Sequence, residues 1–196
     1  MSILNFIVAQ IDLEKVPLTL NNEKIIKVIE NGKKIDSTNI ADVNLIAKND
    51  KELVSAVWLK NLQSLQDFAT SPEHLNFMFS DMNKMITGIW TSQINIDSIY
   101  EAKAFTHAFI FGIKNLTGFF EWEIHAYIQA MKALPGDIFS GNSLEQRDIF
   151  RAGGIVLLNA DQKKIFEKQL SILNKKYQNI VSITNISFVE IIHLKN

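Results

Sequence analysis

Apolar residues are spaced differently at the ends of the chain and in its middle. Residues 2–13 are almost continuously apolar and β-branched, and this pattern predicts a buried strand. Residues 155–158 predict a second short buried strand, and Asn159 begins a helix with apolar residues at helical spacing. Residues 180–194 are again rich in β-branched residues. The two ends of the chain therefore contribute strands.

In the middle of the chain, apolar residues recur at intervals of three and four, which is typical of amphipathic helices. This spacing predicts helices over about 50–69, 71–90, 98–115 and 119–134, and Pro135-Gly136 ends the last of them. The third segment is apolar on most sides, so we expect it to be central.

Three shorter segments have weaker patterns. Residues 16–20 predict an edge strand, since Pro17 cannot donate a hydrogen bond to a neighbouring strand. Residues 23–35 fit either a short helix that ends at Asn31-Gly32 or a hairpin that turns there. Residues 142–151 predict another short helix.

These elements predict an α+β fold. A helical block, about residues 50–134, packs on a small sheet formed by the N- and C-terminal strands. We expect a single domain over residues 1–196. The alternative is an internal division, in which the helical block lies beside a strand-containing lobe of residues 1–49 and 150–196. No internal repeat is visible in the sequence.

Charge and cysteine content exclude several classes of protein. The net charge is −1, with 20 basic and 21 acidic residues, so a non-specific nucleic-acid binder is disfavoured. The chain has no cysteine, which excludes disulfides and thiolate metal sites. Residues 1–6 contain no basic residue, so we do not expect them to be a secretion signal, and the densest apolar stretch, 104–113, is too short to span a bilayer. We expect a cytoplasmic protein without a membrane partner, and the bias towards Ile, Asn and Lys suggests a bacterial or phage source.

Glu121 and His125 are the main candidates for chemistry. They lie four residues apart on the polar face of the predicted helix 119–134, so their side chains can meet. If this helix and the preceding one form a hairpin, His107 approaches the same face. Glu121, His125 and His107 would then bind one divalent metal, since a zinc site needs at least three protein ligands. The alternative is an ordinary surface pair on the back of a packed helix.

Aromatic residues suggest a different role. Phe111, Phe119 and Trp122 do not fit the buried stripes of their predicted helices, so we expect them to form an exposed patch. Phosphate-binding loops and the serine-hydrolase elbow are absent from the sequence. The sequence therefore favours a non-enzymatic interaction protein of the adaptor, inhibitor, immunity or assembly-chaperone type, which binds another protein or itself and needs no cofactor. The alternatives are a metal-dependent hydrolase that uses the Glu/His face and a nucleic-acid-associated regulator.

Overall fold

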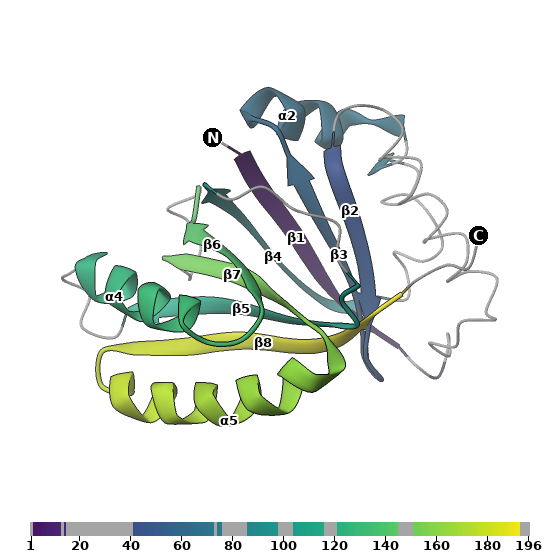
Figure 1. Ribbon diagram of the computed structural model, residues 1–196. Coiled ribbons are helices and arrows are strands. Elements are labelled where there is room, and N and C mark those ends of the chain that lie inside the picture. The colour runs from purple at the N-terminus through teal and green to yellow at the C-terminus, as the bar shows by residue number, and fades with distance from the viewer. Residues whose placement is uncertain are drawn as a thin grey trace.

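The computed structural model of the protein describes residues 2–12, 14, 41–72, 74–75, 86–97, 104–115, 121–144 and 151–192. Within these residues, eight strands form one sheet and three helices accompany it (Figure 1). The strands are β1 (Ser2–Ile11), β2 (Ala41–Lys48), β3 (Glu52–Leu59), β4 (Ile86–Ile96), β5 (His107–Asn115), β6 (Asp137–Asn142), β7 (Ala152–Leu158) and β8 (Val181–Ile191). The helices are α2 (Leu62–Thr70), α4 (Glu121–Lys132) and α5 (Ala160–Tyr177).

The sheet contains the same strand pattern twice. Its order is β4-β1-β3-β2-β8-β5-β7-β6, and all its strand pairings for which a register is given are antiparallel. The first half, β1 to β4, and the second half, β5 to β8, each place their strands in the order fourth, first, third, second. The second half is a complete β-α-β-β-α-β unit, the ferredoxin-like arrangement. The chain therefore contains a structural repeat that its sequence does not reveal.

The two halves meet at both edges, so the sheet curls into a nearly closed barrel. At one junction β2 pairs with β8, where Ala47 lies opposite Ile191. At the other junction Ile94 of β4 forms a β-bridge with Ser143, just after β6, and the Leu144 backbone N–H donates to the Gln93 carbonyl oxygen at 2.8 Å. Barrel closure leaves few strand edges exposed to other chains.

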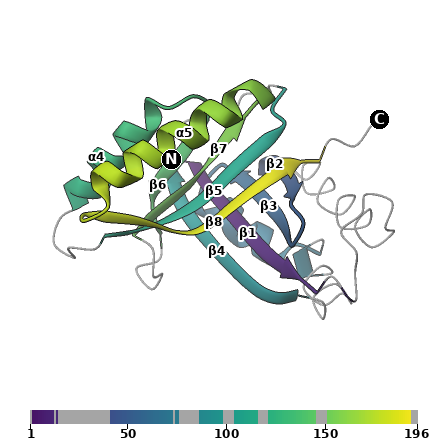
Figure 2. The same ribbon diagram turned by 90° about the horizontal axis from the view of Figure 1, so that it is seen from below.

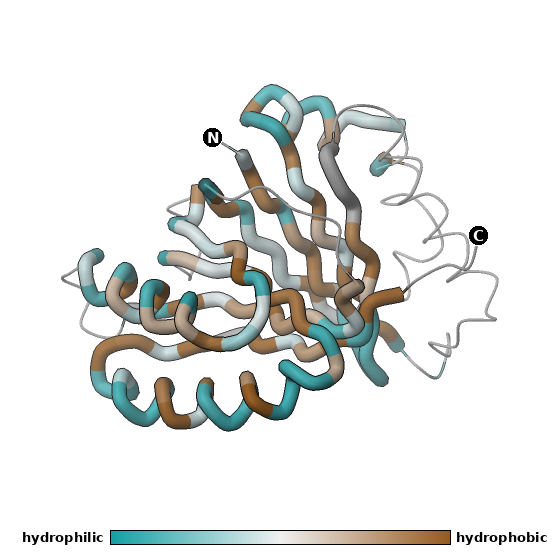
Figure 3. Tube along the Cα trace, in the orientation of Figure 1, coloured by the Kyte–Doolittle hydropathy of each residue, from teal (hydrophilic) through white to brown (hydrophobic). Residues whose placement is uncertain are grey.

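Apolar side chains fill both surfaces of the barrel wall. The interior holds a buried cluster that includes Leu4, Phe6, Val54, Trp58, Ile110, Phe139, Ile155 and Leu157. On the outside of the second half, α4 and α5 cover β5 to β8 and bury a second cluster that includes Phe109, Phe111, Ile124, Tyr127, Met131, Val156 and Phe166 (Figure 2). Figure 3 shows the same pattern. Many strand residues are hydrophobic, and hydrophobic and hydrophilic residues alternate along the helices.

The predicted helical block on a small sheet is wrong. Three segments predicted to be helical contain strand residues: β3 lies within 50–69, β4 begins at Ile86 near the end of 71–90, and β5 lies within 98–115. The reason is that β3 and β5 have apolar residues on both faces, one facing the barrel interior and the other facing helices. A strand of this kind has a continuous apolar run in place of a strict alternation, and such a run also satisfies helical spacing.

Other elements are confirmed. The first strand, the strand at 155–158, the helix that Asn159 begins and the C-terminal strand are all present as β1, β7, α5 and β8. Helix α4 lies within the predicted segment 119–134, and Gly136 follows it with a φ of 110°. The expectations for residues 16–20 and 23–35, and most of the helix expected at 142–151, fall outside the described residues, although Asn142 itself ends β6. In the parts of the chain that the structure describes, no helix is both long and apolar enough to cross a membrane.

Candidate functional site

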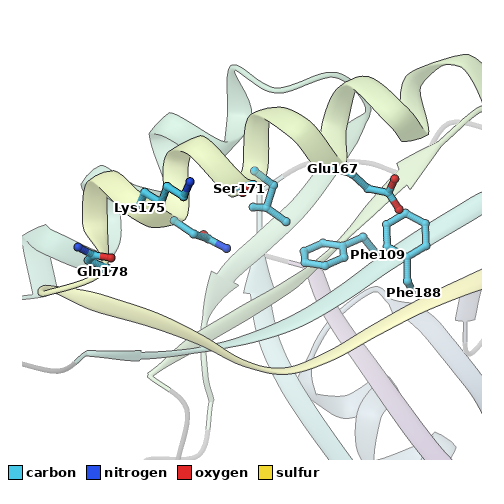
Figure 4. A pocket seen from close by; sticks show the side chains of 8 residues that line it. Phe109, Glu167, Ser171, Lys175, Gln178 and Phe188 are labelled. Atoms are coloured by element: carbon cyan, nitrogen blue, oxygen red, sulfur yellow. The ribbon is translucent and has the colours of Figure 1, made fainter.

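A groove lies between helix α5 and the strands β5 and β8, on the outer face of the second half (Figure 4). Its volume is about 440 Å³. This falls in the range of small-molecule sites, roughly 300 to 1,000 Å³. The strands contribute Phe109 and Phe188, and the helix contributes Glu167, Leu170, Ser171, Asn174, Lys175 and Gln178. The groove is therefore aromatic on the sheet side and mostly polar on the helix side.

The floor of the groove is a pair of aromatic rings from neighbouring strands. Phe109 of β5 lies opposite Phe188 of β8 in the strand register, and their ring centroids are 5.8 Å apart. Phe166 of α5 packs behind Phe109 at 5.2 Å. The Lys163 Nζ atom lies 4.9 Å from the centroid of the Phe188 ring, a cation–π contact. These contacts hold the two rings in place. Phe109 is only 2% exposed, so the partly buried Phe188 ring supplies the apolar surface of the floor.

The wall of the groove follows from the period of an α-helix. Leu170, Asn174 and Gln178 are spaced four residues apart, so they form one row along α5. Glu167, Ser171 and Lys175 form the neighbouring row. Figure 4 shows Glu167 near the two phenylalanine rings and Lys175 and Gln178 towards the other end. The groove thus has an aromatic end and a polar end.

The start of α5 is set by a capping box. The Asn159 side chain accepts a hydrogen bond from the Gln162 backbone N–H, and the Gln162 side chain accepts one from the Asn159 backbone N–H, both at 2.9 Å. One turn further on, Phe166 is fully buried. The cap and this anchor fix which side chains of α5 face the strands.

Tyr127 of α4 positions one polar group of the wall. Its hydroxyl donates a short hydrogen bond to Asn174 Oδ1, and its ring packs edge-on against Tyr177 at 5.4 Å. Burial raises the pKa of the Tyr127 phenol, so this group remains a donor. Because Oδ1 of Asn174 is engaged, its Nδ2 group is the end of the amide that can donate to a ligand.

The structure separates His107 from the two other predicted metal ligands. His107 begins β5, where it lies opposite Glu190 of β8, and its Nδ1 atom is 2.9 Å from the Thr106 hydroxyl. Its ring lies 6.4 Å from that of Phe188, beside the aromatic end of the groove, but it does not line the groove. His107 therefore does not supply a second imidazole to the metal site predicted at Glu121 and His125.

Glu121 and His125 lie on the exposed face of α4, as predicted. His125 contacts Gln129 on the same helix. The His125 Nε2 atom lies 3.4 Å from the Gln129 Nε2 atom. Among the described residues, no group of three or more His, Cys, Asp or Glu side chains could hold a metal ion. Glu121 and His125 thus lie on the surface of α4, and their role as metal ligands stays a prediction.

The three aromatic residues predicted to form a patch do not share one exposed surface. Phe111 is fully buried beneath α4 and α5, because it is a strand residue of β5 and faces the helices. Trp122 is 62% exposed, in agreement with its predicted position off the buried stripe of α4. Phe119 lies outside the described residues.

A second hollow lies beside the turn between β2 and β3 and is lined mainly by polar and acidic side chains. Its Glu52 carboxylate accepts hydrogen bonds from Ser187 Oγ at 2.6 Å and from Asn49 Nδ2 at 2.7 Å. Ser187 belongs to the second half, so Glu52 connects the two halves of the barrel. This hollow contains no aromatic side chain, and the groove beside α5 is better suited to an organic ligand.

Sequence reasoning missed every residue that lines the groove. The two rows of α5 could have been found from the sequence, because the helix itself was predicted and its spacing is regular. The opposite wall could not, because Phe109 lies in a segment that was predicted to be helical. The pairing of Phe109 with Phe188, 79 positions later, has no signal in a single sequence.

Comparison with known proteins identifies the fold. No family model matches the chain, and no curated protein matches it in sequence. Among solved structures, chlorite dismutase from Candidatus Nitrospira defluvii in complex with imidazole is similar over 98% of this chain and 91% of its own, with a TM-score of 0.64 and 13% identity. A protein from Lactobacillus acidophilus provisionally named a monooxygenase is similar over 97% of this chain and 93% of its own, with a TM-score of 0.60 and 12% identity.

An anthrone oxidase-like protein is also similar, with a TM-score of 0.61, 10% identity, and coverage of 98% of this chain and 92% of its own. At these identities the likeness shows the fold alone, a barrel of two ferredoxin-like halves. The proteins that share this fold are named for enzymatic activities. These names contradict the hypothesis of a non-enzymatic interaction protein, which rested on the missing catalytic motifs, the nearly neutral charge and the surplus of aromatic residues.

Proposed function

We propose that the protein is an enzyme that carries out oxygen chemistry on a small organic substrate bound in the groove beside α5. The observation that carries this proposal is the groove itself, in which the Phe109 and Phe188 rings face a polar helix wall. Small-molecule sites combine an apolar lining with a few placed polar groups in this way. The names of the similar structures, a monooxygenase, a chlorite dismutase and an anthrone oxidase-like protein, support the choice of reaction class.

The groove offers two kinds of chemical group to a substrate. Glu167 supplies a carboxylate near the aromatic end, and a carboxylate at this position can accept a proton from a substrate held against the rings. Ser171, Asn174 and Lys175 supply hydrogen-bond donors along the rest of the wall. The substrate is therefore held by stacking and oriented by polar contacts from one helix.

Haem is one cofactor that supports oxygen chemistry, and protein-bound haem iron is held by His, Cys, Met or Tyr. None of the eight side chains that line the groove belongs to these types. His107 lies beside the groove but outside its lining. The lining residues do not fit haem ligation, so the proposed activity does not include it.

Anthrone is the probe that tests this proposal, in an oxygen-electrode assay with the untagged protein. Wild-type protein should raise oxygen uptake above the rate of anthrone alone in buffer. Ser171→Trp should return the rate to that of buffer, because a large ring at this position fills the groove without entering the core. The matched control is Ile172→Trp, since Ile172 is the next residue of α5 and is 62% exposed outside the groove.

Ile172→Trp should keep the wild-type rate. A wild-type rate no higher than that of buffer would contradict the proposed oxygen chemistry. Equal rates for wild type and Ser171→Trp would place the reaction elsewhere in the molecule. Folding of each variant is checked by its thermal unfolding midpoint.

A further inference from the structure

The two ends of the groove differ in charge as well as in polarity. At the aromatic end, the Glu167 carboxylate and the Lys163 ammonium lie one helical turn apart, and Lys163 rests on the Phe188 ring. Their charges are opposite and their spacing allows them to offset each other. Beyond Phe188, His107 lies opposite Glu190 in the strand register. The aromatic end therefore offers a ring-binding surface with no uncompensated positive charge.

At the polar end, the lining side chains are all hydrogen-bond donors or cations. Lys175 supplies an ammonium group, Asn174 presents Nδ2 because Tyr127 occupies Oδ1, and Gln178 supplies a second amide. No carboxylate is among the lining residues at this end. Lys176, the neighbouring cation, lies over the Tyr177 ring at 5.5 Å and is not part of the lining. The polar end is thus suited to an anion.

The distance between the two ends limits the size of the ligand. Leu170, beside the rings, and Asn174 are one helical turn apart, roughly 6 Å along the axis. From these contacts we infer that the groove binds an aromatic carboxylate, with its ring against Phe188 and its carboxylate at Asn174 and Lys175. This inference rests on the proposed function only in taking the groove as the ligand site.

Isothermal titration calorimetry with 2-naphthoate and 2-naphthamide tests the inference. The two probes share a ring system and nearly the same size, and only the first carries a negative charge. Wild-type protein should bind 2-naphthoate about threefold to tenfold more tightly, as expected for a charge-assisted contact with a partly exposed lysine. Lys175→Gln should remove this preference. The matched control Lys168→Gln should retain it, because Lys168 is an exposed lysine of α5 outside the groove.

The experiment separates failure of this inference from failure of the proposed function. If both probes bind equally well and Ser171→Trp abolishes both, the groove is a ligand site but the carboxylate assignment is overturned. If a preference for 2-naphthoate persists in Lys175→Gln, the assignment to Lys175 is also overturned. If neither probe binds, or Ser171→Trp changes nothing, both the inference and the groove as a site are overturned.

Discussion

The two halves of the barrel have the same strand order but differ on their outer faces. In the first half, the pairing of β1 with β4 places Asn5 opposite Gln93 on the outside of the barrel. In the second half, the corresponding pairing of β5 with β8 places Phe109 opposite Phe188. At these two pairs of positions, the same backbone arrangement carries polar amides in one half and aromatic rings in the other. The same topology can therefore carry different side chains at paired positions of the two halves.

The helices show the same division. Helix α2 has 9 residues and buries Leu65 and Phe68 against the strands of the first half. Helix α5 has 18 residues, but Phe166 and Leu170 are its only fully buried side chains. After Leu170, the side of α5 that lines the groove carries Asn174 and Gln178, while Leu173 and Tyr177 pack against the core. The groove therefore follows the polar side of the last two turns of α5.

Truncating Phe166, the main buried anchor of α5, should have the largest effect of the changes considered, measured as a loss of unfolding free energy. Phe166→Ala leaves a cavity beneath the helix, and truncating a buried aromatic side chain costs about 3 to 5 kcal/mol of unfolding free energy. Urea denaturation measures this loss directly. The control is Ile165→Ala, because Ile165 is 52% exposed on the same helix. It should change stability by less than about 0.5 kcal/mol. Similar losses for both variants would show that α5 is not anchored through Phe166.

A smaller effect is expected where the two halves meet. A Cβ atom on Gly141 of β6 would lie 1.7 Å from the Asn95 carbonyl oxygen of β4, so the backbones approach too closely for any side chain. Gly141→Ala should push the strands apart, at a cost of roughly 1 to 3 kcal/mol, as for other overpacked sites. The Leu144 amide, which bonds to the Gln93 carbonyl across this junction, should exchange its hydrogen faster.

Gly88→Ala is the matched control for this junction. A Cβ atom there would meet the end of the Gln10 side chain, which can rotate away, whereas Gly141 faces a backbone oxygen. The control should leave both stability and Leu144 exchange close to wild type. If Gly141→Ala is equally harmless, the barrel is not held closed by contact between β4 and β6.

The sequence allowed the second half to be predicted better than the first, for a physical reason. Helices α4 and α5 each have one buried and one exposed face, so their period is visible in the sequence. Strand β3 does not alternate, because Val54 and Trp58 face the barrel interior while Val57 faces α2. Its apolar residues therefore fit a helix as well as a strand.

The repeat and the groove depend on contacts between distant residues. The halves share their topology but not their side chains, as Asn5 and Phe109 illustrate, so no sequence repeat marks the duplication. His107 was a reasonable candidate, and it does lie beside the groove, but its partner across the strands is Glu190 and not His125. A single sequence contains the residues of the site, but it does not contain the strand register that brings them together.

The smallest expected effect concerns the bond that positions the polar wall of the groove. Tyr127→Phe removes the hydroxyl that donates to Asn174 and should cost about 1 kcal/mol of unfolding free energy near neutral pH, the usual net value of one hydrogen bond. Tyr177→Phe is the control, because it keeps the ring contact between the two tyrosines and leaves the Tyr127 hydroxyl in place.

The same variant should also change how stability depends on pH. Burial raises the pKa of Tyr127 above the value of about 10 for an ordinary tyrosine. In alkali the unfolded chain therefore loses this proton first and binds fewer protons than the native state, so wild-type stability falls as pH rises beyond that value. Tyr127→Phe lacks this contribution, and its disadvantage should shrink between pH values of about 8 and 10.5 in urea denaturation. Tyr177→Phe should follow the wild type. A constant difference between wild type and Tyr127→Phe would mean that the phenol is no more protected from ionisation in the native protein than in the unfolded chain, and that the Asn174 amide is not held by a buried donor.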